Sequence, residues 1–95
     1  MIRIGEIMDE IYEVILDRRS NPQEGSYTNY LFDKGLDKIC KKIGEEAAEV
    51  IIAAKNRNAA ELTYETGDLL YHLCVLLAEQ NVSLDDVYEE LKKRR

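Results

Sequence analysis

Acidic residues at helical spacing are the part of this sequence best suited to chemistry. Glu45, Glu46 and Glu49 form one group, and Glu65 and Asp68 form a second group after fifteen intervening residues. Side chains three or four positions apart share one face of an α-helix. Converging carboxylates repel one another unless a cation or shared protons lie between them. Because such oxygen ligands suit hard ions, the pattern points to magnesium, with manganese as a second choice.

A helical hairpin is needed to bring the two groups together. The spacing of apolar residues predicts an amphipathic helix from about Leu36 to Lys55. Asn58 with Glu61 has the form of a capping box, which opens a second helix running to about Gln80. Only about three residues separate the two helices, and so short a connection makes them antiparallel neighbours.

The register of this hairpin follows from counting outward from its turn. Glu49 should lie level with Glu65, and Glu46 level with Asp68, with the two levels separated by roughly 4.5 Å along the helices. These four residues are the predicted metal ligands. His72 continues the stripe on the second helix. It can bind a metal or pair with Asp68, but a buried, hydrogen-bonded core histidine is the more frequent case.

A solvated helix face explains part of the pattern equally well. Lys42 precedes Glu46 by four residues, which is the spacing of an ordinary surface ion pair. The matched heights of two carboxylate pairs are harder to dismiss in this way. On spacing alone, the metal site and the solvated face stay open.

The rest of the chain is predicted to form an all-α fold. We expect a single domain, residues 1–95, built as a small bundle of about five helices around the central antiparallel hairpin. Leu69 to Ala78 is apolar on almost every side, which predicts burial on every side and a subunit interface in a dimer or larger assembly. The other helices are expected from Ile4 to Arg18, from a Ser26 cap through Phe32 with an end near Gly35, and after Ser83.

The composition of the chain argues against nucleic-acid and membrane partners and indicates the compartment in which the protein lies. The formal charge of −6 disfavours non-specific binding to nucleic acid, which needs clustered Lys and Arg. No apolar run approaches the length of a membrane span, and the N-terminus lacks a signal-peptide core. Two cysteines are too few for a disulfide framework. We therefore expect a cytoplasmic protein with no nucleic-acid or membrane partner.

The acidic groups also resemble a known signature. The run from Glu45 to Glu49, followed by Glu65-Thr66-Gly67-Asp68, is similar to the EExxE…ExxD motif of the all-α nucleoside-triphosphate pyrophosphohydrolases, the MazG-like superfamily. The wider context, over half the chain from Ser26 to Leu77, resembles the phosphoribosyl-ATP pyrophosphohydrolase family. One departure is Gly67, where a better helix former is expected; it can admit a neighbouring backbone.

The resemblance implies a reaction and a set of roles. Phosphoribosyl-ATP would be hydrolysed to phosphoribosyl-AMP and pyrophosphate, the second step of histidine biosynthesis, by a homodimer or larger assembly. Magnesium would be held by the four predicted ligands, with Glu45 as an auxiliary carboxylate. Either Glu45 or Glu49 would accept the proton of the attacking water. Lys38 and Lys42 would bind the phosphates of the substrate, or would only keep the surface soluble. Tyr27 would contact the substrate, or would only pack against the short helix and stabilise it.

Two other functions stay open from the sequence. One is a house-cleaning hydrolase that acts on non-standard or deoxynucleoside triphosphates with the same metal site. The other is a catalytically silent helical dimerisation module whose acidic stripe binds a partner. The intact set of carboxylates argues against the silent module.

Overall fold

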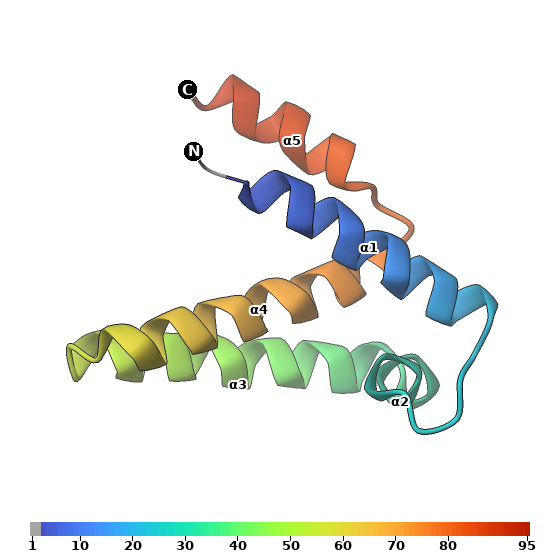
Figure 1. The fold of residues 1–95 in the computed structure, drawn as a ribbon, viewed down its shortest axis with the longest axis horizontal. Coiled ribbons are helices and arrows are strands. Elements are labelled where there is room, and N and C mark those ends of the chain that lie inside the picture. The colour runs from blue at the N-terminus through green and yellow to red at the C-terminus, as the bar shows by residue number, and fades with distance from the viewer. Residues whose placement is uncertain (1–2) are drawn as a thin grey trace.

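Five α-helices make up the computed structural model, which describes residues 3–95 and holds no β-strand within them (Figure 1). The all-α fold predicted from the sequence is confirmed, and α1 is two residues longer than expected. The helices are α1 (Ile4–Ser20), α2 (Tyr27–Lys34), α3 (Leu36–Lys55), α4 (Ala59–Glu79) and α5 (Leu84–Lys93).

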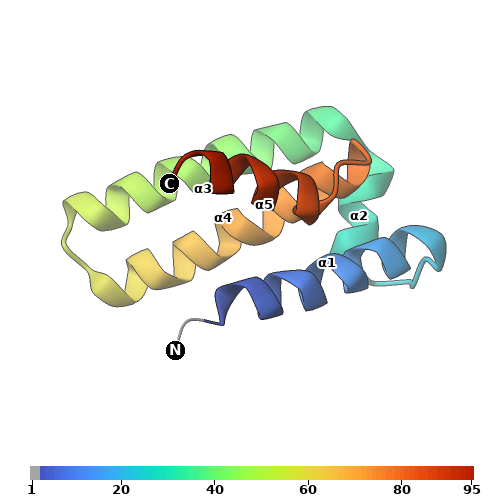
Figure 2. The same cartoon turned by 90° about the horizontal axis from the view of Figure 1, so that it is seen from above.

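The hairpin of α3 and α4 is the centre of the molecule. The two helices lie antiparallel and side by side in both views (Figures 1 and 2). Their turn is tight because Arg57 takes a left-handed conformation with φ of 51°. The Asn58 side chain then accepts a hydrogen bond from the backbone N–H of Glu61 at 3.0 Å, which confirms the predicted cap of α4. The reciprocal half of the capping box is not formed, because the Asn58 N–H donates to the carbonyl of Ala53 at 3.2 Å.

The core lies where α1 and α2 pack against the hairpin. Tyr12 and Ile15 of α1 are buried there, and the Tyr12 hydroxyl donates a 2.6 Å hydrogen bond to the carbonyl of Val82. α1 thereby holds in place the loop that follows α4. The other buried apolar residues of this cluster are Leu31, Ile39, Cys74, Val75 and Ala78.

Gly35 sets the direction of α2 relative to the hairpin. Its N–H donates to the carbonyl of Leu31 at 3.0 Å, and its own carbonyl accepts from the N–H of Ile39 at 3.1 Å. One residue thus ends α2 and begins α3. Its backbone angles, φ 93° and ψ −173°, belong to a region that only glycine adopts readily. The sharp change of direction carries α2 across one end of the hairpin (Figure 2).

The stretch Leu69 to Ala78, predicted to be buried on every side, is covered within the single chain, and a subunit interface at this stretch stays a prediction. Every residue in this stretch is buried or half-buried within the single chain, because α1, α2 and α3 surround α4 there. The exposed large apolar side chains lie elsewhere: Ile4, Ile7 and Val14 on α1, Tyr27 and Tyr30 on α2, Leu36, Ile51 and Ile52 on α3, Tyr64 on α4, and Tyr88 and Leu91 on α5. Over residues 3–95, none of the helices combines the length and the apolar character that crossing a bilayer requires.

Candidate metal centre

Two clusters of ligand atoms meet across the hairpin. One carboxylate oxygen each from Glu46, Glu49 and Glu65 lie within 4.8 Å of one another. Oxygens of Glu46 and Asp68 lie equally close to a ring nitrogen of His72. Since Glu46 belongs to both clusters, the four carboxylates predicted from helical spacing form one continuous acidic site.

Burial makes this acidic site unusual. Glu46 is only 3% exposed and Glu65 only 8% exposed. In each, the Oε2 atom is buried and has no hydrogen-bond partner. A buried carboxylate oxygen without a partner is costly and rare in native proteins. A cation or a proton bound to these two oxygen atoms would remove that cost.

The pKa values of the cluster reflect the same conflict. Burial raises the pKa of Glu46 to about 7, and hydrogen bonds with Asp68 and Glu49 act in the same direction. A hydrogen bond with Glu49, together with burial, raises the pKa of Glu65 to about 7. Hydrogen bonds from Glu65 and Glu46 lower the pKa of Glu49. Without a cation, these carboxyl groups relieve their repulsion by sharing protons.

The donor set fits magnesium or manganese. All four side chains offer oxygen only, which suits a hard ion, and two of the oxygen atoms are buried without partners. His72 has no free ring nitrogen, because Nε2 lies 2.9 Å from the Tyr27 hydroxyl and Nδ1 lies 2.8 Å from the Asp68 carbonyl oxygen. The carboxylates are thus the better candidates for binding a metal.

The lysines predicted to meet phosphates lie at one border of the site. The Nζ atom of Lys42 is 3.5 Å from an oxygen of Glu45 and 3.5 Å from an oxygen of Glu46. Glu45 belongs to neither cluster and is half exposed. Lys38 lies one turn away, with its Nζ 5.9 Å from the centre of the Tyr30 ring. Lys42 therefore reaches the carboxylates, whereas Lys38 contacts α2.

Aromatic residues of α2 and α4 border the same end of the site. The ring of Tyr27 lies 6.0 Å from that of Tyr30 and 6.2 Å from that of Tyr71. Tyr27 remains 45% exposed, so its ring is open to a ligand while its hydroxyl faces His72. The hydrogen bond between Tyr27 and His72 joins residues 45 positions apart, and sequence spacing gave no signal for it.

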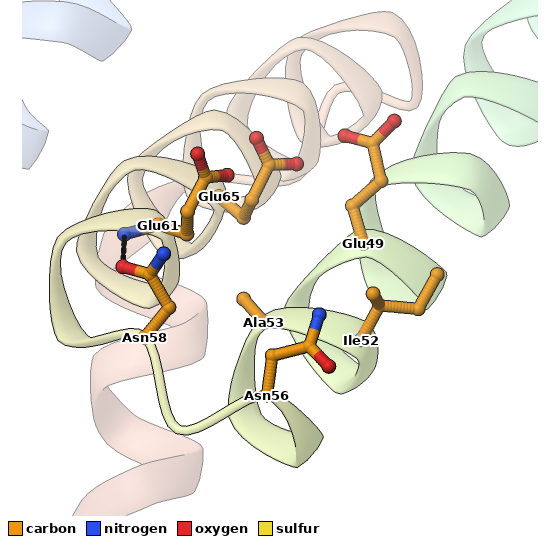
Figure 3. A pocket seen from close by; sticks show the side chains of 7 residues that line it. All are labelled: Glu49, Ile52, Ala53, Asn56, Asn58, Glu61 and Glu65. Carbon is orange, nitrogen blue, oxygen red and sulfur yellow. Dashed lines mark hydrogen bonds between the residues drawn. The ribbon is translucent and has the colours of Figure 1, made fainter.

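An open cleft of about 480 Å³ borders the opposite end of the site, towards the hairpin turn (Figure 3). Glu49 on α3 faces Glu61 and Glu65 on α4 across it. Glu61 is predicted from the sequence only as part of the cap of α4, yet it lies on the same helical stripe as Glu65 and lines this cleft. The lining residues are Glu49, Ile52, Ala53, Asn56, Asn58, Glu61 and Glu65.

A family model and several known proteins are similar to this chain over most of its length. The sequence model of the phosphoribosyl-ATP pyrophosphohydrolase family matches residues 8–95. The phosphoribosyl-ATP pyrophosphatase of Limosilactobacillus fermentum is 62% identical over 87 residues, which cover 92% of this chain and 82% of that protein.

Longer relatives also match. The histidine biosynthesis bifunctional protein HisIE of Thermoanaerobacter pseudethanolicus is 65% identical over 86 residues, covering 90% of this chain and 40% of that protein. The HisIE protein of Caldanaerobacter subterraneus is 60% identical over 89 residues, covering 94% of this chain and 43% of that protein. The chain thus spans about two fifths of the length of these bifunctional relatives.

Proposed function

Because the chain belongs to the phosphoribosyl-ATP pyrophosphohydrolase family, we propose that it hydrolyses phosphoribosyl-ATP to phosphoribosyl-AMP and pyrophosphate in histidine biosynthesis. The observation that carries the proposal is the pair of buried, partnerless oxygen atoms of Glu46 and Glu65 at the meeting of two acidic clusters. A phosphorylated substrate cannot approach such a site unless a cation balances the charge.

Glu46, Glu49, Glu65 and Asp68 would hold magnesium, with manganese as an alternative. When bound, the metal would neutralise charge on the phosphate oxygens and make the attacking water more acidic. Asp68 and Glu46 approach the site from α4 and α3 respectively, so the hairpin itself fixes the relative positions of the ligands. Rigid placement of this kind favours catalysis because no reorganisation is needed during the reaction.

Glu49 is the preferred proton acceptor of the two candidates. It lines the open cleft, where a water molecule and the substrate can reach its carboxylate. Glu45 instead lies outside both clusters and pairs with Lys42. A base must reach the proton that it removes, so position favours Glu49 over Glu45. Glu45 would act as an auxiliary carboxylate that holds Lys42.

The two ends of the site suit different parts of the substrate. Lys42, with Lys38 one turn behind it, would balance the charge of the phosphates, and Tyr27 would contact the substrate through its exposed ring. At the other end, Asn56 and Glu61 offer hydrogen-bonding groups that suit sugar hydroxyls, and the Glu61 carboxylate would repel a phosphate. The leaving pyrophosphate would therefore lie towards the lysines.

A dimer or larger assembly and a cytoplasmic location complete the proposal. Self-association is supported by exposed apolar side chains on α1 and α5, which a single chain leaves uncovered. A cytoplasmic location is the expected one for a biosynthetic enzyme that acts on a nucleotide. The proposed partners are phosphoribosyl-ATP and a second copy of the chain.

Hydrolysis of phosphoribosyl-ATP in oxygen-18 water, followed by phosphorus NMR, tests the reaction. We expect pyrophosphate and phosphoribosyl-AMP as the first products, in the presence of magnesium and not in excess chelator. Orthophosphate as the first product would contradict the proposal. A parallel panel of deoxynucleoside triphosphates separates the alternatives: rapid turnover of the panel alone would support the house-cleaning hydrolase, and no turnover of any substrate would support the silent module.

A further inference from the structure

His72 is the one histidine of the chain, and it is almost completely buried at the border of the acidic site. Only 2% of its surface is exposed. Both ring nitrogens have partners: Nε2 lies 2.9 Å from the Tyr27 hydroxyl, and Nδ1 lies 2.8 Å from the carbonyl oxygen and 3.3 Å from the Oδ1 atom of Asp68. His72 therefore connects a proposed metal ligand on α4 with a proposed substrate contact on α2.

The partners of His72 determine which nitrogen carries the proton. The atoms around Nδ1 are a carbonyl oxygen and a carboxylate oxygen, and both can only accept hydrogen bonds. Nδ1 must then be the donor. In a neutral imidazole the other nitrogen is an acceptor, so Nε2 takes the proton of the Tyr27 hydroxyl.

This arrangement decides what Tyr27 can offer to the site. Once its hydroxyl donates to His72, the phenol oxygen has only lone pairs left for other partners. Lys42 and Asp68 are among the charged groups that act on this hydroxyl. A phenol oxygen that only accepts would receive a hydrogen bond from the Lys42 ammonium group or from a substrate hydroxyl.

We propose that His72 is a positioning residue: as the Nδ1–H tautomer it orients the carboxylate of Asp68 and fixes the Tyr27 hydroxyl as a hydrogen-bond acceptor towards the site. The effect on turnover rests on the proposed reaction and the effect on metal affinity rests on the proposed metal site, whereas the tautomer rests on neither. Groups that orient a ligand from behind typically contribute about 10–100-fold to metal affinity or activity.

Long-range proton–nitrogen NMR of the metal-free wild-type protein tests the tautomer directly. Because the chain has a single histidine, an untagged protein gives one pair of ring-nitrogen signals. We expect a protonated Nδ1 and an unprotonated Nε2. A proton on Nε2 would overturn the inference, whatever any variant does.

Matched variants test the positioning role. Asparagine at position 72 places an amide N–H near the position of Nδ1 and removes the acceptor for Tyr27, whereas glutamine places its amide near the position of Nε2 and removes the donor to Asp68. We expect His72→Gln to weaken binding of Mn²⁺, measured by calorimetry, about 10-fold or more. His72→Asn and Tyr27→Phe should leave that affinity unchanged. Unchanged affinity in a folded His72→Gln protein would contradict the role.

Turnover of phosphoribosyl-ATP provides the last test. We expect His72→Asn and Tyr27→Phe to lower kcat by the same factor, and the double variant to lower it no further, because both remove the same hydrogen bond. Independent, additive losses would contradict the coupling. Tyr12→Phe is the control and should leave kcat unchanged, since it removes a tyrosine hydrogen bond outside the site, to the carbonyl of Val82. Absence of turnover in the wild type would refute the proposed function, while the NMR and Mn²⁺ results would still decide the role of His72.

Discussion

Glu46 is the carboxylate shared by both ligand clusters, and its ionisation is resisted by burial. Its pKa of about 7 in the folded chain lies above the ordinary value of 4.5. Between these values the folded state binds more protons than the unfolded state, so stability declines as pH rises. The contribution of protonated Glu46 to the free energy of unfolding is fully present below pH 4.5 and is lost as the pH rises through about 7.

Glu46→Gln removes this ionisation and should therefore flatten part of the pH dependence. In chelator, we expect the melting temperature of the variant to gain on the wild type progressively from pH 5 to pH 8, because the wild type alone acquires the buried charge. Thermal unfolding at four pH values measures the difference between the two proteins. A difference that is constant over this range would show that Glu46 does not ionise there.

Glu49 lines the cleft, so its substitution tests chemistry more cleanly than stability. We expect Glu49→Gln to lower kcat by about 10²–10⁴-fold, the range for loss of a proton acceptor. The circular dichroism spectrum should not change. Glu45→Gln is the matched comparison on the same helix and should have the smaller effect. The reverse order would make Glu45 the base.

At the level of elements, Gly35 is the residue whose conformation no other amino acid adopts readily. A Cβ atom added there would meet no heavy atom within 4 Å, so the penalty of a substitution comes from the backbone alone. We expect Gly35→Ala to lower the free energy of unfolding by about 1–3 kcal/mol. Urea denaturation measures this, and an unchanged midpoint would mean that α2 meets α3 in another way.

Gly67 provides the opposite control. It lies inside α4 with ordinary helical geometry, and an added Cβ would again meet nothing within 4 Å. The idea that Gly67 admits a neighbouring backbone is therefore wrong for the single chain. We expect Gly67→Ala to raise the free energy of unfolding by about 1 kcal/mol through helix propensity. Destabilisation instead would indicate that a second chain packs against this position.

The sequence predicted the hairpin because periodicity and the Asn58 cap are local signals. The convergence of carboxylates across it followed from counting residues along two antiparallel helices. The contact between Tyr27 and His72 could not be predicted in this way, because it depends on the direction that Gly35 gives to α2. Likewise, an apolar stretch shows that Leu69 to Ala78 is covered, but not whether its own chain or another covers it.

At the level of the whole molecule, the exposed apolar side chains suggest where copies associate. Ile7 is 46% exposed and Val14 is 50% exposed on one helix, and Leu91 on α5 is 60% exposed. We expect sedimentation at micromolar concentration to show a dimer or larger species. Glu substitutions at Ile7 and Val14 should shift it towards the monomer without loss of helix, because these side chains lie outside the core. A wild-type monomer would contradict self-association.

The sparse packing of α5 has a consequence for the timescale on which this helix opens. None of its residues is buried, and it lies beside the bundle on the α4 side of the hairpin (Figure 1). A helix of ten residues is shorter than the roughly 12–15 residues that an isolated helix needs for stability in water.

In dilute solution, the backbone amides of α5 should therefore exchange with deuterium long before those of α3 and α4, as a separate cooperative unit. If a second chain covers Tyr88 and Leu91, that exchange should slow as the protein concentration rises, while exchange in the hairpin stays constant. Mass spectrometry at two protein concentrations would measure exchange in α5 and in the hairpin within each sample. Exchange in α5 that is independent of concentration would mean that another surface joins the copies. If exchange in α5 does depend on concentration, the exchange rates of its amides measure the fraction of the protein that is assembled.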